Sequence, residues 1–124
     1  MYKIILYEDA RGYCPFLDFL NTLDIQAKSD KKAAGLRKKI NYCIDLIQFG
    51  GTRVGEKFTK QIDGKLWELR PDDHRVFFFM WNGNHIVLLH SFRKETQITP
   101  QHEIEKAIKE MNDWTKRMGL GGDR

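Results

Sequence analysis

The chain lacks the features that mark several large classes of protein. Its 124 residues include only two cysteines, Cys14 and Cys43, which can form at most one disulfide and do not have metal-ligand spacing. No apolar run is long enough to cross a bilayer. The charged segment from Glu8 to Arg11 interrupts the apolar start of a secretory leader, so we expect no such leader. These absences predict a reduced, cytoplasmic protein.

Catalytic signatures are also scarce. The sequence has no glycine-rich phosphate loop and no nucleophile elbow. Its four histidines and two cysteines do not form a zinc pattern, and we expect no metal site. There is no internal repeat, low-complexity segment or linker, so the length corresponds to one domain. We expect this domain to cover residues 1–118 and a flexible tail to cover residues 119–124.

Positive charge is present in local excess. The net charge is +4, and residues 31–65 carry nine Lys or Arg against three Asp or Glu. Residues 1–30 carry three against five, and the remainder carries nine of each. A basic block of this kind suits a phosphate-rich partner. It equally suits a solvated helix face, so charge alone does not assign a function.

The order of helix and strand signals predicts an α+β domain. Pro15 and Asp30 open two segments whose apolar residues recur at helical spacing, and Gly50-Gly51 ends the second one. A third helix begins near Thr99-Pro100. The element order is β-α-α-β-β-β-α, with a mainly antiparallel four-stranded sheet and the helices packed on its apolar face. The strands are residues 2–7, residues 65–70 and a hairpin around Asn82-Gly83, while residues 54–62 fit either an irregular strand or a loop.

The pair Asn82-Gly83 is the strongest turn signal in the chain. A type I′ turn needs positive φ at both central residues, and Asn-Gly tolerates it best. A two-residue loop at this point pairs Arg75 with His90, so that both side chains share one face of the sheet. Only an odd-length loop or a bulge would separate them.

Strand alternation divides the predicted sheet into a charged face and an apolar face. An even-length turn over residues 71–74 places Glu68 and Arg70 beside Arg75 and His90, which gives one polar patch. The same face carries, nearer the Asn-Gly turn, Phe77, Phe79, Ile86 and Leu88. The opposite face carries no charge and is the predicted core, formed by Trp67, Leu69, Val76, Phe78, Met80, Val87 and Leu89.

Four stretches of the second half form a distinctive pattern: LWELR (66–70), HRVFFF (74–79), IVLLHSFRKETQITP (86–100) and EIEKA (103–107). Through them the chain resembles the RelE/ParE superfamily of bacterial toxins, specifically its HigB-like, phage-related branch. The resemblance implies the toxin of a type II toxin–antitoxin pair, which enters the decoding site of a translating ribosome and cleaves the mRNA. It further implies cleavage by the RNA's own 2′-hydroxyl without metal or cofactor, and a helix-turn-helix, HigA-like antitoxin as partner.

The resemblance also suggests roles for single residues. The family's catalytic arginine falls on Arg75, the basic position that closes the preceding strand on Arg70, and the basic pair after the next strand on Arg93 and Lys94. His90, opposite Arg75, is a candidate base or acid because histidine ionises near neutral pH. The residues that we assign to RNA contact are Phe92, Lys57, Lys60, Lys65 and Thr96.

Other interpretations stay open at this point. Glu68 is a second candidate base, but a carboxylate beside two arginines is more often a cross-strand ion pair, which we favour. A ParE-like gyrase poison would not be a nuclease, would bind through the first two helices and would tolerate loss of Arg75 and His90. A plain nucleic-acid-binding module would bind with salt-sensitive affinity spread over residues 31–65.

Overall fold

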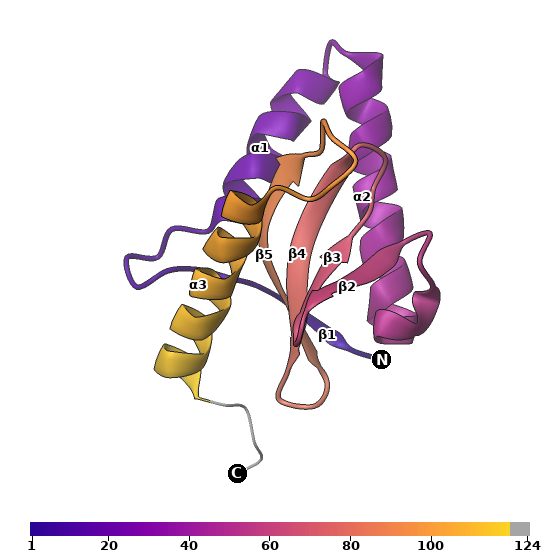
Figure 1. Ribbon diagram of the computed structural model, residues 1–124. Coiled ribbons are helices and arrows are strands. Elements are labelled where there is room, and N and C mark those ends of the chain that lie inside the picture. Colours follow the sequence, from indigo (N-terminus) through magenta and orange to yellow (C-terminus); the bar gives the residue numbers. More distant parts are fainter. Residues whose placement is uncertain (120–124) are drawn as a thin grey trace.

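A five-stranded sheet lies between helices on both of its faces in the computed structural model, which describes residues 1–119 (Figure 1). The α+β class and the mainly antiparallel sheet are confirmed. The predicted tail lies, apart from Gly119, outside the described residues. The elements are β1 (Lys3–Leu6), α1 (Pro15–Ala27), α2 (Lys31–Gly50), the 3-10 helix η1 (Gly51–Val54), β2 (Thr59–Asp63), β3 (Leu66–Leu69), β4 (His74–Trp81), β5 (His85–Arg93) and α3 (Gln101–Met118).

The sheet has the strand order β1-β5-β4-β3-β2, with β1 parallel to β5 and the other neighbours antiparallel. The prediction of four strands was wrong by one, because the ambiguous residues 54–62 contain β2. This strand has the sequence TKQID and mostly exposed side chains. An edge strand with a polar sequence is held by its backbone pairing, so it lacks the apolar alternation that identifies a strand in sequence.

The ends of the first two helices follow the predicted signals. Pro15 stands at the start of α1, where its missing N–H costs nothing. The Asp30 side chain accepts a hydrogen bond from the Lys32 N–H at 2.9 Å and caps α2. Gly51 ends α2 with a φ of 61°, and a Cβ at this position would lie 2.8 Å from the Tyr2 ring. Glycine is therefore required there for both backbone and space.

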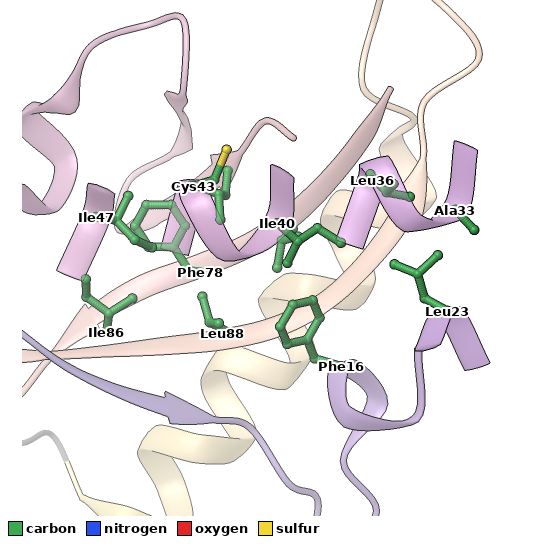
Figure 2. Packing of buried hydrophobic residues seen from close by; sticks show 12 residues of the cluster. Phe16, Leu23, Ala33, Leu36, Ile40, Cys43, Ile47, Phe78, Ile86 and Leu88 are labelled. Atoms are coloured by element: carbon green, nitrogen blue, oxygen red, sulfur yellow. The ribbon is translucent and has the colours of Figure 1, made fainter. Parts of the chain in front are cut away.

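The helix pair α1 and α2 packs on one face of the sheet, which we call the helix-pair face, and α3 packs on the other, the α3 face. Figure 2 shows Phe16 of α1 and Ile40 of α2 beside the strand residues Phe78 and Leu88. Both faces carry a buried apolar cluster, whereas the sequence predicted only one apolar face. The buried strand residues of the α3 face are Leu66, Phe77, Phe79, Val87 and Leu89.

The β4–β5 hairpin differs in register from the prediction. Trp81 pairs with His85, so the loop has three residues, Asn82, Gly83 and Asn84, rather than two. An odd loop moves every following side chain to the opposite face. The predicted faces of β5 were therefore wrong near the turn: Ile86 and Leu88 lie on the helix-pair face, while Val87 and Leu89 lie on the α3 face.

A bulge farther along the hairpin reverses this shift. The register changes between Val76, which pairs with Ser91, and Phe78, which pairs with Leu88. Beyond it Arg75 pairs with Phe92, so the predicted pairing of Arg75 with His90 was wrong. The bulge nevertheless returns His90 to the α3 face, where its ring contacts Phe77.

Candidate functional site

Four charged side chains gather at the end of the sheet where β3 and β5 finish and β4 begins. Glu68 is fully buried, and its Oε2 accepts a hydrogen bond from Arg70 Nε at 3.0 Å. The same oxygen lies 3.6 Å from Arg75 Nε. Lys94 is close enough to Glu68, Arg70 and Arg75 for their charges to alter its pKa. We call Glu68, Arg70, Arg75 and Lys94 the arginine cluster; the predicted proximity of its first three members is confirmed.

Arg75 is the least satisfied member of the arginine cluster. Its Nη1 donates to the backbone carbonyls of Asp72 at 2.9 Å and His74 at 2.8 Å. Its Nε is buried without a hydrogen-bond partner in the described part of the chain, since 3.6 Å to Glu68 is an ion-pair distance and too long for a hydrogen bond. Burial lowers the pKa of Arg75, and Glu68 only partly opposes this shift.

Two further hydrogen bonds fix the carboxylate and Arg70. Arg70 Nη1 donates to the Glu56 carbonyl at 2.9 Å, which ties the segment before β2 to the end of β3. Thr99 Oγ1 donates to Glu68 Oε1 at 3.1 Å. Thr99 therefore contacts the arginine cluster and does not cap α3, which begins after Pro100 without a side-chain cap. Glu68 is a structural anchor for the two arginines, as its cross-strand position suggested.

Arg93 and Lys94 are neighbours in sequence but lie on different sides of the sheet end. Burial lowers the pKa of Lys94, the charge of Arg75 lowers it further, and Glu68 opposes both. Arg93 instead donates from Nε to Asp73 Oδ2 at 3.1 Å and lines a cavity of about 380 Å³ beside α1 and α2. Strand alternation separates the two side chains. The structure thus adds Lys94 to the arginine cluster and places Arg93 outside it.

His90 belongs to a different group of charges. It is 3 % exposed, with Nδ1 2.6 Å from Glu110 Oε1 and Nε2 2.9 Å from Glu103 Oε1. We call His90, Glu103 and Glu110 the histidine cluster. Both ring nitrogens are engaged with carboxylates of α3, and neither has a recorded contact with Arg75. This geometry does not support the sequence hypothesis that His90 moves protons beside Arg75.

Sequence reasoning missed the partners of His90. Glu103 and Glu110 are seven residues apart on α3, so they lie on the same side of the helix. Ala107 and Trp114, which are buried on the same helix, mark this side as the one that faces the sheet. The sequence did contain a signal for a buried basic partner, because two glutamates lie on the same side of α3 as its buried apolar residues.

The predicted RNA-contact residues divide into two groups. Phe92 pairs with Arg75 and stacks on Phe77 at 5.4 Å, and Lys60 is close enough to lower the pKa of Lys94. Lys57 lines a small cavity together with Arg70 and Arg75. Lys65 lies at the opposite end of β3, near Trp81 and Met111. Thr96 is on an exposed loop, where its hydroxyl donates to the Ile98 carbonyl at 2.7 Å.

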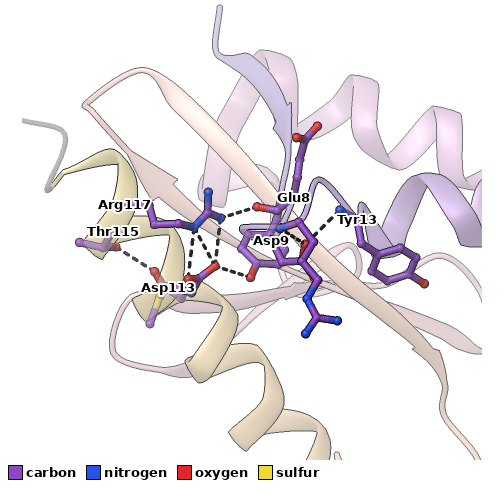
Figure 3. A network of polar contacts seen from close by, with 9 residues as sticks. Glu8, Asp9, Tyr13, Asp113, Thr115 and Arg117 are labelled. Carbon is purple, nitrogen blue, oxygen red and sulfur yellow. Dashed lines mark hydrogen bonds and ion pairs between the residues drawn. The ribbon is translucent and has the colours of Figure 1, made fainter.

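A separate polar network holds α3 against the segment after β1 (Figure 3). Tyr7 OH donates to Asp113 Oδ2 at 2.6 Å, and burial followed by Asp113 raises the pKa of Tyr7. Arg117 pairs with Asp113 at 2.9 Å and also donates to the Glu8 carbonyl. Within residues 1–119 neither this network nor any other group of three His, Cys, Asp or Glu side chains is arranged to hold a metal ion.

The sequence of residues 18–112 matches the family of phage-derived Gp49-like proteins (DUF891), and the chain belongs to this family. It is similar to two proteins named probable endoribonuclease HigB1, from Mycobacterium tuberculosis strains CDC 1551 / Oshkosh and ATCC 25618 / H37Rv. Identity is 41 % over 64 residues, which cover 48 % of this chain and 50 % of each relative. The chain thus spans about half the length of the curated relatives it matches. Together these matches confirm the resemblance to the HigB-like, phage-related toxins. No described helix is long and apolar enough to span a membrane.

Proposed function

We propose that the chain is the toxin of a type II toxin–antitoxin pair and an endoribonuclease that cleaves mRNA on translating ribosomes. The observation that carries the proposal is the arginine cluster, in which Arg70 and Arg75 share one buried carboxylate oxygen, and burial together with the charges of both arginines lowers the pKa of Lys94. Membership of the Gp49-like family and the name of the HigB1 relatives support RNA as the substrate. The site offers positively charged hydrogen-bond donors, which suit a phosphate better than a neutral ligand; they are Arg70, Arg75 and Lys94.

The proposed reaction is an internal transesterification. The 2′-oxygen of one nucleotide attacks the adjacent phosphorus, the bond from phosphorus to the 5′-oxygen breaks, and the products are a 2′,3′-cyclic phosphate and a free 5′-hydroxyl. Negative charge grows on the non-bridging oxygens in the transition state. The guanidinium of Arg75, already oriented by the two backbone carbonyls that accept from its Nη1, is the donor for one of these oxygens. No step requires a metal.

Lys94 is the proposed proton donor to the departing 5′-oxygen. Burial and Arg75 lower its pKa, which makes its ammonium group a stronger acid than that of an ordinary lysine. Glu68 is occupied by Arg70 and Thr99, so the 2′-hydroxyl gives its proton to solvent. A site without a dedicated base depends on alignment of the nucleophile for much of its rate, and the ribosomal decoding site supplies that alignment.

The partner that follows from this proposal is a HigA-like, helix-turn-helix antitoxin that blocks the basic end of the sheet. The place of action is the cytoplasm, where translating ribosomes are found. Arg93, Lys57, Lys60 and Phe92 surround the arginine cluster at this end and form the proposed contact surface for mRNA, since their charges and the aromatic ring suit a single strand.

Primer extension on a defined mRNA, with and without translating ribosomes, tests the function. We expect codon-phased cuts only when ribosomes translate, and no cut at a position where the message carries a 2′-deoxy nucleotide. An intact message in every lane while growth is still arrested would contradict the proposal. That outcome would favour the gyrase-poison interpretation and direct attention to the exposed apolar residues of α1 and α2, namely Leu17, Ile25, Tyr42 and Phe49.

A further inference from the structure

A cavity of about 220 Å³ lies between α2 and the arginine cluster. Three elements besides β4 contribute to its wall: Lys39 comes from α2, Lys57 from the segment before β2, and Arg70 from the end of β3. Arg75 and Asp72 complete its charged lining. Lys39 takes no part in the proposed reaction.

The charges around this cavity are unbalanced. Four cationic side chains line it, against the single carboxylate of Asp72, whose Oδ1 lies 3.8 Å from Lys39 Nζ. Cations held this close repel one another, and the partly buried Arg75 is screened least by water. A bound anion would relieve this repulsion.

Lys39 and Lys57 are differently prepared for an anion. The Lys57 ammonium lies 5.6 Å from the centre of the Phe58 ring, a cation–π distance that restrains it beside the cavity. The Phe58 ring is in turn held by an edge contact with Tyr42 of α2 at 6.0 Å. The Lys39 side chain is 45 % exposed, and within residues 1–119 its ion-pair partner is Asp72 alone, so its ammonium can turn towards a ligand.

We propose that this cavity binds a phosphate group of the RNA strand, next to the phosphate that is cleaved, and that Lys39 is its binding residue on α2. The inference rests on the proposed function because it takes RNA as the ligand. Arg75 belongs both to the cavity and to the arginine cluster. A phosphate in the cavity would therefore lie beside the one at the arginine cluster, and Lys39 extends the RNA path from the sheet end onto α2.

Lys38 and Lys39 provide a matched pair of variants for the test. Both are exposed on α2 and adjacent in sequence, but only Lys39 lines the cavity. The probe is a fluorescein-labelled decaribonucleotide with 2′-O-methyl groups throughout, which cannot be cleaved, and its affinity is measured by anisotropy over a range of KCl concentrations.

Lys39→Ala should weaken binding roughly tenfold, the loss expected for one hydrogen bond to a charged group. The slope of log K against log salt should fall by about 0.7, the value for one phosphate of a single strand. Lys38→Ala should change affinity less than about twofold. Equal effects of the two variants would overturn the assignment of Lys39.

A second arm examines the cavity without RNA. Inorganic phosphate is titrated into the protein while the Arg75 Nε–H resonance is followed by NMR. We expect a saturable shift in the wild type and in Lys38→Ala, and a weaker one in Lys39→Ala. No shift in the wild type would overturn the anion site.

If ribosome-dependent cleavage occurs but the two lysine variants behave alike, this inference fails and the proposed function stands. If phosphate saturates the cavity but the RNA does not bind and no message is cut, the proposed function fails and an anion site remains.

Discussion

The sheet carries two groups of charges, each with a buried carboxylate, that differ in how completely they are paired. In the histidine cluster each ring nitrogen of His90 has its own carboxylate, at 2.6 Å and 2.9 Å. In the arginine cluster two guanidiniums share one carboxylate oxygen, Arg75 Nε has no hydrogen-bond partner within residues 1–119, and the pKa of Lys94 is lowered. The first group is internally satisfied, and the second has surplus donors.

The difference indicates which group is available for a ligand. A satisfied buried cluster contributes to holding α3 on the sheet, and its loss should appear in stability. A cluster with an unpartnered buried donor and surplus positive charge carries a cost in the free protein that a bound anion removes. We therefore expect variants of the arginine cluster to act mainly on RNA cleavage and variants of the histidine cluster to act mainly on folding.

The largest effect on cleavage is expected from Arg75→Ala. Removal of a guanidinium that contacts the transition state typically costs roughly 10³-fold or more in rate. Stability should change little, because Glu68 keeps Arg70 and Thr99 as partners. Primer extension on translating ribosomes gives the rate, and urea unfolding gives the stability. Undiminished cleavage by a folded Arg75→Ala protein would remove Arg75 from the mechanism, and Arg75→Lys separates the need for charge from the need for the planar fork.

His90→Ala should produce the opposite pattern. The buried Glu110 and the half-buried Glu103 lose their shared partner, and breaking a buried pair costs about 3–5 kcal/mol in free energy of unfolding. His85→Ala is the matched control on the same strand, because His85 Nδ1 has no hydrogen-bond partner in the described chain. Urea unfolding of both variants tests the prediction. If His90→Ala is as stable as His85→Ala but inactive, His90 belongs to the chemistry after all.

Lys94→Gln should slow cleavage about a hundredfold, the lower range for loss of a general acid. The adjacent variant Arg93→Gln should have a much smaller effect because Arg93 lies outside the arginine cluster. In the wild type, cleavage should fall as pH rises through the lowered pKa of Lys94, since the reaction needs its protonated form. Lys94→Arg should move this fall to higher pH. A pH profile identical in wild type and Lys94→Arg would show that another group titrates.

The smallest effect is expected from Thr99→Val, which removes one hydrogen bond to Glu68. A bond of this kind contributes about 1 kcal/mol to stability. Thr96→Val provides the control, because its hydroxyl bonds only within an exposed loop. Chemical unfolding should distinguish the two variants. Equal stabilities would mean that Thr99 does not fasten the loop to the arginine cluster.

Much of the fold and of the arginine cluster could be predicted because alternation along β3 and β4 is undisturbed. Glu68, Arg70 and Arg75 were placed together on this basis, and their contacts confirm it. The β4–β5 register could not be predicted, since Asn82-Gly83 fits both a two-residue and a three-residue loop. Asn82 and Gly83 do have the positive φ values that a type I′ turn requires, 56° and 77°, but Asn84 also stays outside the ladder.

The bulge in β5 and the partners of His90 depend on tertiary contacts, which the sequence pattern does not show. The bulge places one extra residue in β5, and the alternation of side chains in the sequence does not reveal it. The odd loop shifts the side chains of β5 to the opposite face, and the bulge shifts them back. His90 therefore lies on the predicted face although the predicted register was wrong. Its partners Glu103 and Glu110 lie on α3. The apolar residues of this helix indicate which side faces the sheet, but they do not indicate which strand residue the two carboxylates meet. The sequence does not single out Lys39 as a ligand-binding residue, because most lysines on the polar side of an amphipathic helix are simply solvated.

The parallel pairing of β1 with β5 has a consequence for how each molecule is made. Lys3 lies opposite His85, so β1 has no partner in the sheet until β5 has been made. Contacts between residues so far apart in sequence form slowly, and α1 and α2 emerge before the sheet they cover exists. Lys94 directly follows β5, which pairs with the strand that carries Arg75. The sheet can therefore close only after β5 has left the ribosome, and the cationic groups of the arginine cluster come together only at that stage of folding.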